Sequence, residues 1–208
     1  MHRMKLVPAL EGLAAAGLVT LTAACGSNTP ASPSPTTFHA DVTDPAGDAV
    51  AVPGVPVAPD LVHATVDVNG ANITLAIQFA SGTLDPATTR LTIELDTDQN
   101  PATGNLAAGP LGIDYILDVW ATRNPAVSVQ QATPATCTGS GSCYVQTGTA
   151  PITAATDTLT TTVPLAMFGN ASGRLNFRAL VYSSTQTTTP AAVADVMPDI
   201  TLPAAHIP

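Results

Sequence analysis

Basic residues are scarce in this sequence. Its 208 residues include only six lysines and arginines, against fifteen aspartates and glutamates. Beyond Cys25 no lysine remains, and four arginines face fourteen carboxylates, which leaves a net charge of −10. Nucleic-acid binding needs a basic surface to neutralise phosphates, so this balance excludes DNA and RNA as partners. The acidity indicates either a solvated surface or carboxylates gathered around a hard cation.

Long hydrophobic runs are also missing. The apolar stretch at 12–24 has 13 residues, fewer than the ~20 that span a bilayer. It follows Arg3 and Lys5, as in a bacterial signal peptide. It ends in Leu-Thr-Ala-Ala directly before Cys25, which resembles the lipobox of bacterial lipoproteins. We predict a signal peptide at 1–24 and a diacylated Cys25; ordinary cleavage nearby, leaving a free thiol, is the alternative.

A segment rich in Ser, Thr and Pro follows the predicted anchor. Residues 26–37 read GSNTPASPSPTT and lack apolar periodicity, so we assign 25–37 to the lipidated cysteine and a disordered linker. Residues 38–208 have the length of one domain. This organisation predicts an extracytoplasmic, monomeric protein, held through Cys25 to the membrane in the periplasm, at the outer membrane or at the cell surface.

Sustained helical periodicity is missing from residues 38–208, where short alternating segments are separated by Gly, Pro, Asn and Asp. In 61–68, alternation puts Val62 on the core face and Leu61 on the opposite face. We predict an all-β fold, a two-sheet antiparallel β-sandwich of jelly-roll or Ig-like type. The Thr-rich segment 130–150 is predicted to loop out. The predicted strands lie at 61–68, 73–79, 90–96, 113–120, 127–129, 159–163 and 175–181, with one helical turn at 164–168.

The sequence has only three cysteines. Besides Cys25, Cys137 and Cys143 bracket a short Gly- and Ser-rich segment. An extracytoplasmic compartment permits oxidation, so we predict a disulfide between them, with a pair of free thiols as the alternative. No histidine lies nearby in the sequence, which argues against a zinc site.

Enzyme signatures are missing. The sequence has no G-x-S-x-G, H-E-x-x-H or P-loop motif, and the lack of lysine beyond residue 25 excludes Schiff-base chemistry there. Asp114 and Asp118 are four apart on one predicted strand, roughly 13 Å by strand rise, which exceeds the usual glycosidase spacings. We therefore predict a non-catalytic protein.

One motif is rich in oxygen ligands. Asp96, Asp98 and Asn100 alternate directly after a predicted strand, and Asp114 comes later on the chain. A curled D-x-D-x-N loop places three oxygen side chains around one point, which suits Ca²⁺. The motif is not an EF-hand, because the sixth position is proline and no glutamate closes the loop. The alternative is a set of Asx-turns. Asp44 and Asp48 form a second acidic turn, which turn chemistry explains at least as well as a metal.

Several turn motifs follow one another along the chain: Asp44-Pro45-Ala46-Gly47-Asp48, Pro59-Asp60-Leu61, Asp96 to Gly104, Gly112-Ile113-Asp114-Tyr115 and Pro198-Asp199. Their order resembles the DOMON-like superfamily, specifically its domains similar to family 9 carbohydrate-binding modules. This resemblance covers most of residues 38–200. It implies a calcium-stabilised β-sandwich, with structural calcium as the cofactor, and in some members a sugar or haem ligand.

Aromatic residues make up only 4% of the chain, so the aromatic clamp of such modules cannot be assigned. Trp120, the one tryptophan, is a candidate to stack on a sugar, with Asp118 and Arg178 supplying hydrogen bonds. The alternative is that Trp120 covers an edge of the fold or packs near Cys143. No C-x-x-C-H haem motif is present.

These features predict a lipid-anchored envelope protein whose calcium-stabilised domain is a non-catalytic binding module for carbohydrate. A structural or protein-interaction lipoprotein without a sugar ligand is the alternative.

Overall fold

The computed structural model describes residues 37–51, 54, 57–85, 88–106, 111–120, 126–133, 143–169, 173–183, 192–199 and 203–207. The chain divides into a unit at 1–33 and a unit at 34–208, and all described residues belong to the second. The predicted signal peptide, the lipid-bearing Cys25 and the linker before residue 37 lie outside the described residues.

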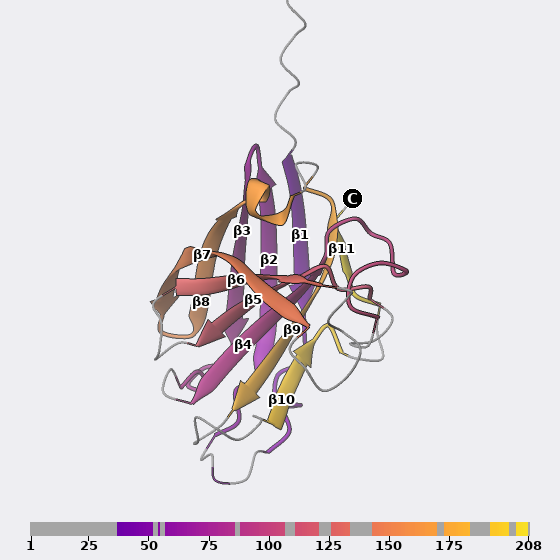
Figure 1. Ribbon diagram of the computed structural model, residues 1–208. Helices are drawn as coiled ribbons and strands as arrows, with labels where there is room; N and C mark the ends of the chain where they lie inside the picture. The colour runs from indigo at the N-terminus through magenta and orange to yellow at the C-terminus, as the bar shows by residue number, and fades with distance from the viewer. Residues whose placement is uncertain are drawn as a thin grey trace, which may run out of the picture. The chain divides into compact units, whose positions relative to one another are not determined.

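The all-β prediction is confirmed, and the described residues form eleven strands, with a short 3₁₀ turn after β8 (Figure 1). No helix in this described part is long and apolar enough to cross a bilayer. The elements are β1 (Thr37–Thr43), β2 (Leu61–Asn69), β3 (Asn72–Phe79), β4 (Thr89–Asp96), β5 (Tyr115–Trp120), β6 (Ala126–Ala132), β7 (Tyr144–Ala155), β8 (Thr158–Pro164), η2 (Leu165–Phe168), β9 (Leu175–Ser183), β10 (Ala192–Met197) and β11 (Ala205–Ile207).

The strands form one antiparallel sheet in the order β1-β2-β3-β8-β7-β6-β5-β4-β9-β10, with β11 also paired to β9. Strand β7 joins the two halves, since its first part pairs with β6 and Ile152–Ala155 pair with β8. The sheet is nearly barrel-shaped. The predicted division into two sheets, as in a jelly-roll or Ig-like sandwich, is therefore not confirmed.

Strand β7 begins inside the segment 130–150, so the prediction that this segment loops out is wrong for residues 144–150. Residues 134–142 lie outside the described residues. Gln130–Ala132 also continue β6. Most side chains of β7 are exposed, so the strand has no buried face to produce alternating hydrophobicity. Its edges are paired by backbone hydrogen bonds to β6 and β8, and backbone pairing leaves no signal in side-chain composition.

The core lies inside the curved sheet and is formed by inward-pointing residues of most of the strands. On β4, for example, Leu91, Ile93 and Leu95 are at most 1% exposed. The predicted inward face of this strand is confirmed, although Thr92 and Glu94 on the opposite face are buried as well. A smaller cluster of Leu111, Ile113 and Ile116 forms apart from the main core.

The two ends of the strand order, the β1–β2 region and β10, approach each other near the start of β2. The Val50 amide donates to the Ala194 carbonyl at 2.7 Å, and the Leu61 amide donates to Asp195 Oδ2 at 2.7 Å. Both contacts join the β1–β2 region to β10. They draw the curved sheet toward a closed barrel, which leaves less edge exposed to pairing with other chains.

The predicted orientation of Leu61 is wrong. The pairing of β2 with β3 shifts register between Leu61 and His63. Such a bulge adds one residue and reverses which side chains point inward. Leu61 is consequently 0% exposed, whereas Val62 is only half-buried.

This bulge makes a testable prediction. We expect Leu61→Ala to lower the free energy of unfolding by about 2–5 kcal/mol, because it leaves a cavity in the core. Val62→Ala, the matched control, should cost roughly 1 kcal/mol or less. Urea unfolding of both variants measures the difference. Equal costs, or a larger cost at Val62, would show that uninterrupted alternation describes β2 better.

Candidate metal and ligand site

The loop that leaves β4 is built on buried and hydrogen-bonded carboxylates. Asp96, the last residue of β4, is 0% exposed. Its Oδ1 accepts from the Asn100 amide at 3.1 Å, and its Oδ2 accepts from Asn176 Nδ2 at 3.0 Å. Asn176 lies on the neighbouring strand β9. These bonds hold the base of the loop to two adjacent strands.

Three of the predicted metal ligands come together. Asp96, Asp98 and Asp114 each offer a carboxylate oxygen, and the three oxygens lie within 4.8 Å of one another. Ca²⁺ binds oxygens at 2.3–2.6 Å, so oxygens of one ion can lie up to about 5 Å apart. The donor chemistry and the spacing therefore fit a hard cation. Burial raises the pKa of Asp96 and of Asp114, although hydrogen bonds from Asn176 and Thr97 oppose this shift.

The fourth predicted ligand, Asn100, takes part in the turn itself. Its Oδ1 accepts from the Ala102 amide at 3.1 Å. Asp98 Oδ1 accepts from the Asn100 amide at 2.9 Å, and Asp98 Oδ2 accepts from Thr103 Oγ1 at 3.0 Å. The Asx-turns considered as the alternative are thus present. Donors from the chain itself already satisfy these oxygens, so a cation here would compete with them.

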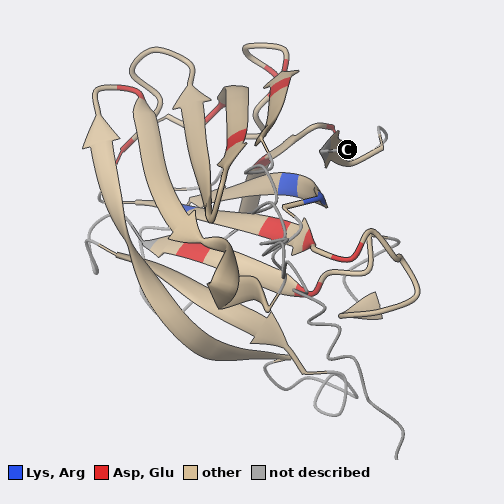
Figure 2. Cartoon of the chain, turned by 90° about the horizontal axis from the view of Figure 1, so that it is seen from above, with Lys and Arg blue, Asp and Glu red and all other residues tan. Residues whose placement is uncertain are grey.

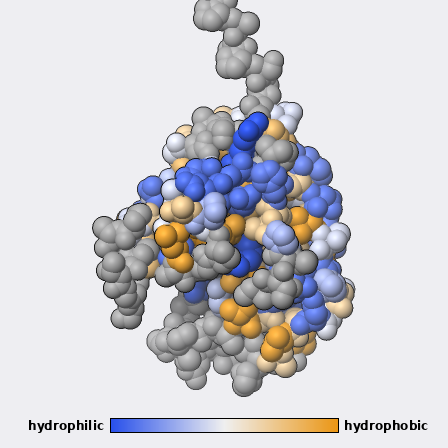
Figure 3. Space-filling model, turned by 90° about the vertical axis from the view of Figure 1, so that its right-hand side faces the viewer, coloured by the Kyte–Doolittle hydropathy of each residue, from blue (hydrophilic) through white to orange (hydrophobic). Residues whose placement is uncertain are grey.

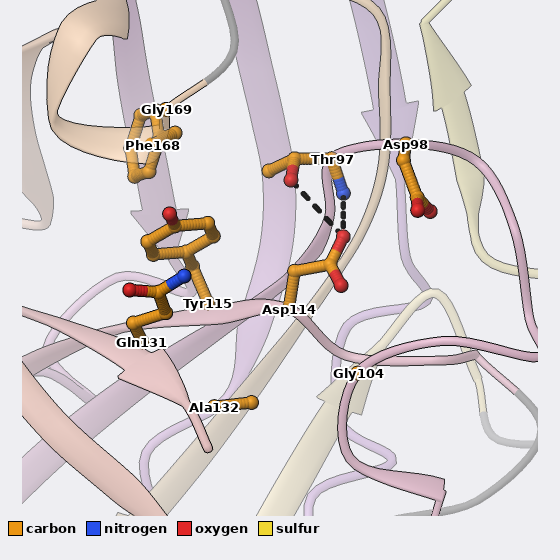
Figure 4. A pocket seen from close by; sticks show the side chains of 9 residues that line it. All are labelled: Thr97, Asp98, Gly104, Asp114, Tyr115, Gln131, Ala132, Phe168 and Gly169. Atoms are coloured by element: carbon orange, nitrogen blue, oxygen red, sulfur yellow. Dashed lines mark hydrogen bonds between the residues drawn. The ribbon is translucent and has the colours of Figure 1, made fainter. Parts of the chain in front are cut away.

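A pocket of about 600 Å³ opens beside this loop (Figure 4). Asp114 Oδ2 accepts from the Thr97 amide at 2.9 Å and from Thr97 Oγ1 at 3.0 Å. Tyr115 and Phe168 meet edge to face on another side, with ring centroids 5.3 Å apart. The pocket thus combines a carboxylate wall with an aromatic wall. Its lining comprises Thr97, Asp98, Gly104, Asp114, Tyr115, Gln131, Ala132, Phe168 and Gly169.

The predicted sugar-binding residues lie elsewhere, on strands β5 and β9. Asp118 is 7% exposed, and its two oxygens accept from Arg90 Nε at 2.7 Å and Arg90 Nη2 at 3.0 Å. Arg178 Nε donates to Glu94 Oε2 at 2.9 Å. The charged groups proposed to meet a sugar are therefore engaged in ion pairs within the sheet. Trp120 belongs to β5, but its side chain lies outside the described part.

The predicted disulfide stays a prediction. Cys143 is half-buried just before β7, and Cys137 lies outside the described residues.

A second acidic cluster surrounds the contact between β2 and β10. Asp44, Asp48 and Asp195 place carboxylate oxygens within 4.8 Å of one another. Burial, then the charges of Asp195, Asp48, Asp199 and Asp60, raise the pKa of Asp44 to about 7. Figure 2 shows acidic residues at many places along the described chain and few basic ones. The sequence places Asp44 and Asp48 in one turn, but Asp195 lies 147 residues beyond Asp48, and no local motif links it to them.

No family model matches this chain, and no curated protein matches its sequence. The resemblance to DOMON-like domains therefore depends on the turn motifs alone.

The pocket loop contains a glycine that no other residue replaces without cost. Gly104 has φ 65°, and a Cβ there would lie 2.4 Å from the Ile113 carbonyl oxygen. We expect Gly104→Ala to lose about 1–2 kcal/mol from the left-handed conformation, and about 1–3 kcal/mol more from the overlap.

Gly82→Ala is the matched control, because Gly82 has φ 75° and a Cβ there would meet nothing within 4 Å. It should lose only the conformational part, about 1–2 kcal/mol. Denaturant unfolding compares the two variants. Equal losses would mean that the close approach of Gly104 to Ile113 does not constrain the loop.

The raised pKa of Asp44 predicts a pH dependence in the absence of divalent cations. The folded protein binds the Asp44 proton more tightly than the unfolded chain does, since the pKa is about 7 against an ordinary value of 3.8. In EDTA, the melting temperature should therefore fall as the pH rises from about 4 to about 7, and level off above. Asp44→Asn should flatten part of this slope in a thermal melt series. Parallel profiles for the two proteins would contradict the assignment to Asp44.

Proposed function

We propose that this chain is a lipid-anchored envelope protein whose all-β domain is a non-catalytic binding module for carbohydrate, stabilised by calcium. The proposal includes the signal peptide at 1–24, the lipid on Cys25 and an extracytoplasmic location. It also retains the resemblance to carbohydrate-binding modules of family 9 type. The observation that supports it best is the pocket beside the carboxylates of Asp96, Asp98 and Asp114.

The lining of the pocket suits a polar ring compound. Sugars present hydroxyl groups around their rim and C–H groups on their faces. Asp98, Asp114 and Gln131 offer hydrogen-bonding groups to hydroxyls, and Tyr115 and Phe168 offer apolar surface. Ligand pockets typically measure roughly 300–1,000 Å³, and this one is about 600 Å³. We therefore propose that a sugar binds in this pocket and not beside Trp120.

The arrangement of the carboxylates favours cation binding over hydrolysis. A glycosidase places its two carboxyl groups on either side of the scissile bond. Here the oxygens of Asp96, Asp98 and Asp114 converge on one point. Converging acceptors suit a bound cation, which would fix the loop that forms one wall of the pocket.

A protein-interaction lipoprotein is the second candidate, favoured by exposed apolar side chains. Val50 is 65% and Val193 is 42% exposed, and the backbone bond from Val50 to Ala194 brings these residues close together. Figure 3 shows one face of the molecule, where hydrophobic residues form separate groups among hydrophilic ones. Separate groups fit scattered surface residues as well as a docking patch.

One experiment tests both parts of the leading proposal. The purified protein is melted in calcium and in EDTA, and its retention on insoluble polysaccharides is measured in calcium. At 100-fold excess over Kd, calcium adds about 2.7 kcal/mol to stability, which raises the melting temperature by roughly 5–10 °C. Asp98→Asn should reduce this shift. Gln131→Ala should keep the shift and lose retention, because Gln131 lines the pocket but is not a carboxylate.

The results separate the candidates. Retention of the native protein that Gln131→Ala abolishes supports the sugar pocket. Retention by neither protein, across a panel of polysaccharides, rejects the carbohydrate proposal and favours the protein-interaction lipoprotein. A calcium shift unchanged in Asp98→Asn would reject the ion at the Asp96–Asn100 loop.

A further inference from the structure

Four carboxylates meet at the seam between the two ends of the sheet order. Asp44 and Asp48 lie in the turn after β1, Asp60 directly precedes β2, and Asp195 lies on β10. Two segments that are near in sequence and the distant strand β10 therefore supply the cluster. Within the described part of the chain, none of the four forms an ion pair with an arginine or a histidine.

The spacing of three of these carboxylates matches the coordination of one cation. Oxygens of Asp44, Asp48 and Asp195 lie within 4.8 Å of one another. Oxygens bound to the same Ca²⁺ at 2.3–2.6 Å are separated by up to about 5 Å. Like charges at this separation repel unless a proton or a cation lies between them. Without a proton or a cation between them, the repulsion among these carboxylates therefore destabilises the folded protein.

Buried oxygens without a partner give independent support for a ligand. Asp60 is only 5% exposed, and its Oδ1 has no hydrogen-bond partner among the described residues. Its Oδ2 accepts from the Gly47 amide at 2.8 Å, which directs the carboxylate into the turn between Asp44 and Asp48. Asp44 Oδ2 is likewise buried and without a partner there. Buried polar atoms are almost always hydrogen-bonded, so these two oxygens require an explanation.

The backbone at the seam is shaped to hold these side chains. The pairing of β10 with β9 shifts register between Val193 and Asp195, and β2 has its own bulge at Leu61. The Leu61 amide donates to Asp195 Oδ2, and the Val196 amide donates to Asp195 Oδ1, each at 2.7 Å. Bulges commonly re-aim a side chain at a functional site. Here two bulges adjoin the same carboxylate.

The Asp96–Asp98–Asp114 group differs in this respect. Its oxygens accept hydrogen bonds from Asn100, Thr103, Asn176 and Thr97. The cluster at the seam keeps two buried oxygens for which the described chain supplies no donor. The buried oxygens without donors therefore favour a cation at the seam more strongly than at the Asp96–Asp98–Asp114 group.

We propose that Asp44, Asp48, Asp60 and Asp195 form a second binding site for a hard divalent cation, which Ca²⁺ fits by charge and by oxygen ligation. The ion would join the β1–β2 connection to β10 and so fasten the closure of the barrel. Its removal leaves four carboxylates together and loosens the seam.

The test is calorimetric titration of the purified protein with calcium alone. Asp48→Asn is the principal variant, because Asp48 is exposed and its substitution leaves the packing intact. We expect it to bind one calcium fewer per chain than the native protein, or to weaken one affinity at least tenfold. Asp67→Asn, which removes an exposed carboxylate from β2, is the matched control and should change neither. The same titration of Asp98→Asn measures calcium binding at the loop after β4 separately.

A second variant, Asp44→Asn, tests the site through the melting temperature, which should change in opposite directions in EDTA and in calcium. In EDTA, Asp44→Asn should raise the melting temperature, because it removes one of the repelling charges. In calcium, it should lose the part of the upward shift that depends on the seam. If the native protein binds no calcium, or if Asp48→Asn and Asp44→Asn bind calcium as the native protein does, the proposal is overturned. Loss of binding in Asp98→Asn alone also overturns it, whereas loss in Asp48→Asn alone supports this site and rejects the other.

Discussion

The hydrogen bond from the Leu61 amide to the Asp195 carboxylate, 2.7 Å long, joins the two ends of the sheet order. A strand normally continues its sheet through its own backbone groups, and here a side chain supplies the acceptor instead. The contact needs a bulge in β2 to bury Leu61 and a bulge in β10 to aim Asp195. Because the core is enclosed by the curved sheet, the positions of the buried side chains depend on this closure.

Placing a carboxylate at the seam has an electrostatic cost. Asp195 is 8% exposed, and burial raises its pKa, although the amides of Leu61 and Val196 oppose the shift. Asp44 and Asp60 then add further charge beside it. Few other side chains are available to neutralise it, since the domain has four arginines and no lysine. Two of them, Arg90 and Arg178, already pair with Asp118 and Glu94. Among the described residues no arginine or histidine forms an ion pair with the carboxylates at the seam. Bound protons or cations can supply the counter-charge, and only cations bind more strongly as the pH rises.

The sequence predicted those features that appear as local alternation. Strand β4 and its inward residues follow directly from Leu91, Ile93 and Leu95. The gathering of Asp96 and Asp98 followed from their spacing, and Asp114 joined them because β4 and β5 are neighbours. Strand β7 was missed because its side chains are mostly exposed, so backbone pairing alone defines it.

The remaining features depend on contacts between distant segments. Gln131 and Phe168 reach the pocket from β6 and from η2, and neither has a motif around it. The orientation of Leu61 depends on a single inserted residue, which leaves the hydrophobic pattern of the strand unchanged. The pairing of Asp44 with Asp195 depends on which edges of the sheet approach each other. The order of the strands determines which edges approach each other, and the spacing of residues along the chain does not indicate it.

The two acidic groups also show why ligand-like spacing in a sequence is a weak guide to where a cation binds. A D-x-D-x-N loop curls because its own amides and hydroxyls donate to its carboxylates, as the bonds from Asn100 and Thr103 to Asp98 show. The donors that shape the loop thereby reduce its need for an ion. The seam is shaped by distant strands, so the oxygens of Asp44 and Asp60 are buried without local donors. A cation gains most where burial has removed water and the chain has supplied no substitute, and among these two groups that condition holds at the seam.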